Sequence, residues 1–168
     1  LLMCMVWRLS FLVLKSMLNQ LLALIGDTLQ PIYFVYDGAF GNNAAVRMTR
    51  SVGLHLISKL RNDSALCFEW AGTYAGKGPR PRYGERVNYQ QLTACHLKSE
   101  VRTGGILTCT YQFKALHRKF AETLNIVVVT KLNEKTNKLT HVVLFSTDLE
   151  LDWVALVKYY QLRFQIEF

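Results

Sequence analysis

Asp37 stands where the chain could bind a divalent cation. It ends the apolar run IYFVYD (Ile32 to Asp37), and Gly38 follows at once, so that backbone or a ligand can approach closely. The run is typical of a strand that is buried on both faces of a sheet. Ligands of open α/β sheets bind outside the carboxyl ends of such strands, but an aspartate there can equally cap the following helix. Position alone favours neither role.

Glu167 is a second candidate, near the end of a predicted helix. We expect this helix to be capped by Thr147 or Asp148 and to run to the last residue. With about 100° per residue on a helical wheel, Glu167 falls inside the apolar arc. A carboxylate on a buried face needs a partner that replaces its lost hydration. Two partners are possible: Arg163, one turn earlier, or a divalent metal ion shared with Asp37.

Composition narrows the class of protein. The chain of 168 residues is 51% hydrophobic and carries a formal net charge of +8, so it can bury a core and favours a polyanionic partner, nucleic acid or an anionic membrane. A basic but inert surface is the alternative. The four cysteines and four histidines are scattered without a CxxC pair, which argues against zinc and favours reduced thiols in a cytoplasmic protein.

The opening stretch, residues 1–26, is strongly apolar but does not fit a membrane span. Arg8, Lys15 and neighbouring polar residues interrupt it, so no run of about 18 apolar residues survives. The polar residues fall mostly on one side of a helical wheel. We therefore expect an amphipathic helix that packs on a sheet, and no membrane association.

The next segments predict a βαβ unit. Residues 32–37 form its first strand, residues 42–52 a short helix and residues 54–60 its second strand. Such strands should be parallel with a right-handed crossover. Further along, residues 70–90 are rich in Gly, Pro and Arg and should form no regular core element. A strand over 106–113 and a hairpin closed by NEKTNK then precede the last helix.

Four segments resemble a known family. The residues Tyr160, Arg163 and Glu167 match the pattern Tyr-x2-Arg-x3-Glu, which surrounds the third acidic residue of insertion sequence 4-like DDE transposases. YDGAFGN around Asp37 resembles the block of that family's second aspartate. GKGPRPRYG (Gly76 to Gly84) resembles its Arg- and Pro-rich insertion, and STDLEL resembles the entry to its last helix. The resemblance spans about residues 30–168.

This resemblance implies an α/β, RNase H-like fold with a β-rich insertion before the last acidic helix. Residues 1–65 would form a partial core, residues 66–146 the insertion and closing strand, and residues 147–168 the acidic helix. Two aspartates and one glutamate would bind two Mg²⁺ or Mn²⁺ ions, with Asp37 as the second aspartate and Glu167 as the glutamate. The implied activity is metal-dependent DNA cleavage and transfer at transposon ends by a homodimer.

The chain departs from the family pattern at both ends. The first aspartate has no candidate, because Asp27 precedes the strand that Asp37 ends and should lie near the opposite edge of the sheet. The family's pattern also continues to a lysine beyond Phe168. We therefore expect a catalytic domain truncated at both ends, inactive as it stands.

Basic residues are the candidate contacts to DNA. By resemblance, Tyr160 and Arg163 would contact a DNA phosphate beside the metal ions. Lys59 and Arg61, at the end of the strand next to Asp37, could hold the DNA backbone. The Gly/Pro-rich ribbon could bind phosphates or remain a solvated loop; its basic residues are Lys77, Arg80, Arg82 and Arg86.

Two other functions stay open. One is another RNase H-like nuclease, such as a resolvase; the other is an inactive transposon remnant that still binds DNA. Both hypotheses of an active RNase H-like enzyme, the transposase and the other nuclease, require Asp37 and Glu167 to approach closely enough to share metal ions. That approach requires the last helix to pack beside the strand of residues 32–37.

Overall fold

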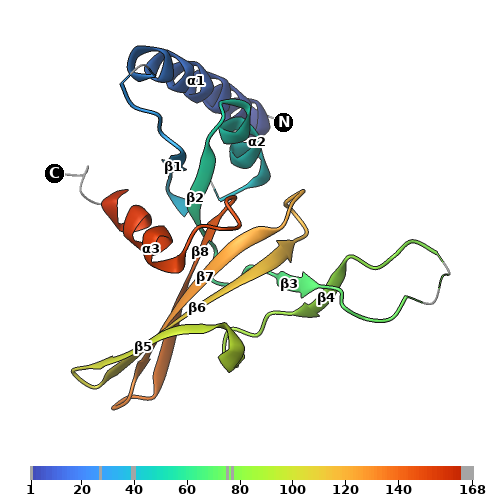
Figure 1. The fold of residues 1–168 in the computed structure, drawn as a ribbon, viewed down its shortest axis with the longest axis vertical. Helices are drawn as coiled ribbons and strands as arrows, with labels where there is room; N and C mark the ends of the chain where they lie inside the picture. Colours follow the sequence, from blue (N-terminus) through green and yellow to red (C-terminus); the bar gives the residue numbers. More distant parts are fainter. Residues whose placement is uncertain (1, 27, 39–40, 75, 77, 164–168) are drawn as a thin grey trace.

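The computed structural model describes residues 2–26, 28–38, 41–74, 76 and 78–163, and for residues 2–10 the backbone alone (Figure 1). The helices of this part are α1 (Leu2–Ile25), α2 (Asn43–Ser51) and α3 (Trp153–Leu162), with a 3₁₀ turn at Ala94–His96. The strands are β1 (Tyr33–Val35), β2 (His55–Leu60), β3 (Leu66–Glu69), β4 (Tyr83–Arg86), β5 (Leu97–Thr103), β6 (Ile106–His117), β7 (Leu124–Asn133) and β8 (Lys138–Ser146). They join in one mixed sheet of order β1-β2-β8-β7-β6-β3-β4, with β5 paired to β6.

The predicted βαβ unit is confirmed. β1 and β2 are parallel, with Tyr33 opposite His55, and α2 connects them. Asn42 caps α2, since its side chain accepts a hydrogen bond from the backbone N–H of Ala45 at 3.0 Å. Gly53, with φ of +77°, follows the helix and adopts the left-handed conformation that ends many helices.

The rest of the sheet is antiparallel. β8 pairs with β2 on one side and with β7 on the other, and the β7–β8 hairpin is the one that the sequence predicts. β6 extends the expected strand of residues 106–113 to His117. Residues 70–90, predicted to form no regular core element, contain the short strand β4, which pairs with β3 but has no buried residue. β4 has two half-buried and two exposed residues, so no apolar periodicity marked it.

Two apolar clusters cover opposite faces of the β1–β2 pair. Side chains alternate along a strand, so Phe34 and Leu56 face α2, whereas Val35 and Ile57 face α3. In Figure 1, α2 and α3 accordingly lie on opposite sides of these strands. Since α3 packs on the second face, its last turn comes close to the carboxyl end of β1.

α1 packs differently from our expectation. It lies mainly against α2 rather than on the sheet (Figure 1), with Leu18 buried and Phe11 touching the cluster on the α2 face. Part of its apolar surface is exposed to solvent, including the side chains of Val13, Met17, Leu21 and Leu24. Within the described residues, no helix combines the length and the apolar character needed to cross a bilayer.

The predicted start of the last helix was also wrong. α3 begins at Trp153, and Asp152 caps it by accepting a hydrogen bond from the backbone N–H of Val154 at 2.9 Å. The residues expected as caps bind the sheet instead. Thr147 accepts a hydrogen bond from the N–H of Leu56 at 3.0 Å, and Asp148 binds β1. Their side chains therefore serve tertiary contacts, which no local pattern could reveal.

The loop between β8 and α3 is fastened by buried amides. Asn125 donates hydrogen bonds to the carbonyl oxygens of Asp148, at 3.0 Å, and Leu151, at 2.7 Å. Gln112 donates to the same carbonyl of Leu151 at 2.8 Å. Because buried carbonyl groups need such donors, these bonds fix where α3 begins.

A hydrogen bond between Tyr33 and Asp148 ties β1 to this loop. The Tyr33 hydroxyl donates to Asp148 Oδ2 at 2.7 Å. Burial, together with this bond, raises the pKa of Tyr33 to about 12. Partial burial acts to raise the pKa of Asp148, but the bonds from Tyr33 and from backbone N–H groups outweigh it and hold that pKa below its usual range.

Replacing Tyr33 by Phe should therefore lower the free energy of unfolding by about 1.5 kcal/mol at neutral pH, since a hydrogen bond to a charged group is lost. A carboxyl group whose pKa is depressed by folding stabilises the fold at pH values above its pKa in the unfolded chain, about 3.9. This stabilisation is lost as the pH falls through the pKa of the folded state. The deficit of Tyr33→Phe should thus shrink below about pH 4. Urea unfolding at several pH values measures it.

Tyr74→Phe is the control for this experiment. The Tyr74 hydroxyl donates a hydrogen bond to the backbone carbonyl of Gly78 in an exposed loop. We expect its removal to change stability by less than about 0.5 kcal/mol. A Tyr33→Phe deficit that is absent, or that persists unchanged into strong acid, would contradict the structural role of Asp148.

Candidate active site

Asp37 lies at the carboxyl end of β1, on the side of the sheet that α3 covers. Alternation along the strand places it with Tyr33 and Val35. Its backbone carbonyl accepts a hydrogen bond from the Ser58 hydroxyl at 2.9 Å, which fixes it against β2. The carboxylate accepts a bond from the N–H of Gly38 and is 58% exposed. Asp37 is thus positioned by its backbone while its side chain meets solvent.

Arg163 comes from the last turn of α3 and reaches this carboxylate. Its Nη1 lies 3.3 Å from Asp37 Oδ2, and its guanidinium carbon lies 5.3 Å from the centre of the Tyr160 ring. One turn earlier, the ring of Tyr159 lies 5.4 Å from that of Tyr33. The last helix therefore packs beside β1, as the shared-metal hypothesis requires.

Glu167 lies outside the described residues, so its distance from Asp37 stays a prediction. The two partners considered for Glu167 were Arg163 and a metal ion. The structure shows that Arg163 contacts Asp37 from the other end of the sequence. An ion pair of Arg163 with Asp37 was not among the expected contacts.

Tyr160 is buried beneath Arg163. Only 7% of it is exposed, and it packs with Leu156 and Ile57 in the cluster on the α3 face. Burial raises its pKa, and the adjacent Arg163 opposes this increase. Its expected contact with a DNA phosphate stays a prediction, whereas its packing role is evident.

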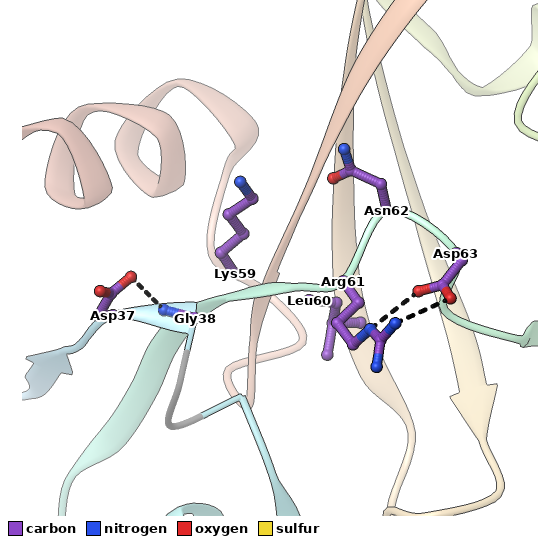
Figure 2. A pocket seen from close by; sticks show the side chains of 7 residues that line it. All are labelled: Asp37, Gly38, Lys59, Leu60, Arg61, Asn62 and Asp63. Carbon is purple, nitrogen blue, oxygen red and sulfur yellow. Dashed lines mark hydrogen bonds and ion pairs between the residues drawn. The ribbon is translucent and has the colours of Figure 1, made fainter.

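An open cleft of about 470 Å³ lies between the ends of β1 and β2 (Figure 2). Asp37 borders it on one side; Lys59, Arg61 and Asp63 border it on the other. Lys59 extends to the same side of the strands as α3 (Figure 2). Arg61 instead binds Asp63 through two hydrogen bonds of 3.1 and 3.2 Å. The cleft combines carboxylates with cations that can bind a phosphate.

Two glycines let the loop after Asp37 pack against β2. A Cβ at Gly38 would lie 3.3 Å from the carbonyl oxygen of Lys59, and one at Gly41 would overlap the same oxygen. The N–H of Gly41 also donates to the carbonyl of Gly38 at 3.1 Å. This close approach explains why the chain has glycine on both sides of the loop.

The predicted site residues fall into two groups. Asp37, Lys59, Arg61, Tyr160 and Arg163 meet at one edge of the sheet. The ribbon residues lie elsewhere. Arg80 and Arg82 lie on the long connection between β3 and β4, which extends away from the sheet (Figure 1), and Arg86 lies on β4. Lys77 lies outside the described residues.

Sequence reasoning missed Asp63 as a cleft residue. It follows β2 by only a few positions, in the turn RNDS, and borders the same cleft as Asp37. The signal was the proximity of this acidic turn to the end of a parallel strand next to Asp37. A second exposed carboxylate in the cleft provides a natural comparison for Asp37.

The donor chemistry of the cleft fits a hard cation in part. Carboxylate oxygens such as those of Asp37 suit Mg²⁺ and Mn²⁺. No three His, Cys, Asp or Glu side chains gather to form a complete metal site within the described ranges. Asp37 and Asp63 are the two carboxylates that border this cleft.

Comparison with known proteins identifies a family. The sequence matches the family described as DDE superfamily endonuclease over residues 12–115. The matched segment includes α2, both parallel strands and the cleft residues Asp37, Lys59 and Arg61. The match indicates nuclease activity with DNA as substrate. Endonucleases of this superfamily depend on divalent metal ions. No match emerges among curated proteins or among solved structures.

If Asp37 serves chemistry rather than stability, its ion pair with Arg163 should contribute little to folding. Ion pairs at the surface typically contribute under about 1 kcal/mol, and here the Asp37 side chain is 58% exposed whereas that of Arg163 is 19% exposed. We expect a coupling energy of that size from a double-mutant cycle of Asp37→Asn and Arg163→Gln, measured by urea unfolding. A coupling of about 3 kcal/mol or more, typical of a buried pair, would make Asp37 a structural residue.

Proposed function

Since this chain belongs to the DDE superfamily endonuclease family, we propose that it is the catalytic part of a transposase that cleaves and rejoins DNA at transposon ends. One observation carries the proposal: the exposed carboxylate of Asp37 at the end of β1 faces Arg163 from the last helix. A carboxylate that can bind metal thus lies beside a cation that can bind phosphate. Lys59 adds a second cation at the same cleft.

The order of elements supports an RNase H-like core within this proposal. A parallel strand–helix–strand unit ends its first strand in Asp37, and a later helix returns to the same edge. Along the sequence, the antiparallel strands β3 to β8 come between β2 and α3, where the insertion is expected. Arg163 and Tyr160, two residues of the Tyr-x2-Arg-x3-Glu pattern, lie at that edge and favour the insertion sequence 4-like branch.

Asp37 and Glu167 are the proposed metal ligands, for two Mg²⁺ or Mn²⁺ ions in the complete enzyme. Such ions supply an activated water or 3′-hydroxyl and neutralise charge on the phosphate under attack. Asp37 suits this role because its carboxylate is solvent-exposed and borders the cleft.

The chain's cations would hold the DNA. Arg163, beside Asp37, would orient the scissile phosphate through its planar guanidinium, which can donate two parallel hydrogen bonds. Lys59 and Arg61 would bind the backbone next to it. Phosphates further along the duplex would be contacted by the basic residues of the ribbon, Lys77, Arg80, Arg82 and Arg86. Two copies of the complete protein would act together as a homodimer.

Cleavage of a transposon-end oligonucleotide by the intact gene product tests the site. Asp37→Asn removes the charge that attracts the metal ion, so we expect cleavage with Mg²⁺ or Mn²⁺ to fall by more than about 100-fold. Asp63→Asn is the matched control: it borders the same cleft, is exposed, and is also paired with an arginine. It should retain activity within a few fold.

Glu167→Gln should abolish cleavage in the same assay while leaving DNA binding largely intact. The substitution keeps the shape of the side chain and removes only its charge. Wild-type-like cutting by Glu167→Gln would show that this residue is no metal ligand. Equal losses in Asp37→Asn and Asp63→Asn would show that the cleft needs negative charge in general, and the assignment of Asp37 would fall.

A further inference from the structure

The turn between β6 and β7, residues 118–123, contacts the β3–β4 hairpin through a basic and aromatic cluster. The guanidinium carbons of Arg82 and Arg118 lie 5.8 and 5.9 Å from the centre of the Tyr83 ring. Arg82 Nη2 also donates a hydrogen bond to the carbonyl oxygen of Ala121 at 2.7 Å. Two arginines from distant parts of the sequence thereby lie against the same aromatic ring.

The charge of this cluster is uncompensated. Arg82, Arg118 and Lys119 are exposed, and none forms an ion pair with a carboxylate of the described residues. Two glutamates of the same region have other partners. Glu122 pairs with Arg50, and Glu69 accepts a hydrogen bond from Thr123. Aromatic and backbone contacts, which carry no negative charge, hold the arginines in place.

We propose that Arg118 and Lys119, together with Arg82, form a phosphate-binding surface for duplex DNA. The inference rests on the proposed function and extends it to a turn that no sequence pattern singled out. The cations are spread over two elements of an open surface, which suits successive phosphates of a duplex better than one small anion. The net charge of +8 is complementary to the same partner.

This surface is tied to the loop that carries Asp37. The N–H of Ala121 donates to Asn43 Oδ1 at 3.3 Å, and Asn43 is the first residue of α2. Glu122 binds Arg50 at the other end of the same helix. DNA bound at Arg118 is therefore positioned relative to α2, whose capping residue closes the loop after Asp37. The turn links DNA binding to the placement of the cleft.

Binding of the full chain to a short DNA duplex of mixed sequence tests the inference by fluorescence anisotropy between about 50 and 200 mM salt. The slope of log affinity against log salt is negative, and each phosphate contact contributes about 0.9 to its magnitude. Replacing both Arg118 and Lys119 by Ala should therefore reduce that magnitude by about 1.8. The control replaces Lys135 and Lys138, at the turn between β7 and β8, by Ala and removes the same charge. It should leave the slope nearly unchanged.

The outcomes separate the two proposals. Equal slopes for the two double variants would overturn the inference while leaving the proposed function standing. A wild-type chain that binds no DNA at low salt would contradict both. Arg118→Gln with Lys119→Gln keeps side-chain bulk over Tyr83 and should reproduce the slope of the alanine pair. If it instead behaves like the wild type, the alanine effect reflects a disturbed hairpin and the inference fails.

Discussion

The packing of α3 on the sheet is the contact on which the candidate site depends. Leu156 and Tyr160 pack with Ile57, Val127 and Leu144, and burial of each large apolar side chain contributes about 1.5–3 kcal/mol. The helix crosses this face because its buried side chains pack there. Its direction is set where it begins, by the buried amides under the preceding loop, and the last turn then reaches the end of β1.

β1 carries an acidic contact at each end, and the two differ in kind. At its amino end, Tyr33 holds Asp148 in a network of hydrogen bonds that depresses the pKa of that carboxyl group. At its carboxyl end, Asp37 is exposed and meets a single arginine. The first arrangement stabilises the attachment of α3, whereas the second leaves a carboxylate available to a ligand. Structure and chemistry are thus separated along one short strand.

The sequence predicted the elements better than it predicted their contacts. The run ending in Asp37 and the helical arc before Arg163 follow from local apolar periodicity, so both could be predicted. The start of α3 could not, since Thr147 has the residue type of a helix cap but binds β2. Likewise, the contacts of Arg163 with Asp37 and of Arg118 with Tyr83 join residues far apart in the chain, which spacing cannot reveal.

Paramagnetic broadening by Mn²⁺ tests most directly whether Asp37 forms the metal site. Added Mn²⁺ should selectively broaden the resonances of the Gly38 amide and of the Arg163 guanidinium, which contact the Asp37 carboxylate from two elements. The effect should disappear in Asp37→Asn. Broadening centred on other acidic residues, such as Glu150 and Asp152, or broadening unchanged by Asp37→Asn, would contradict the account.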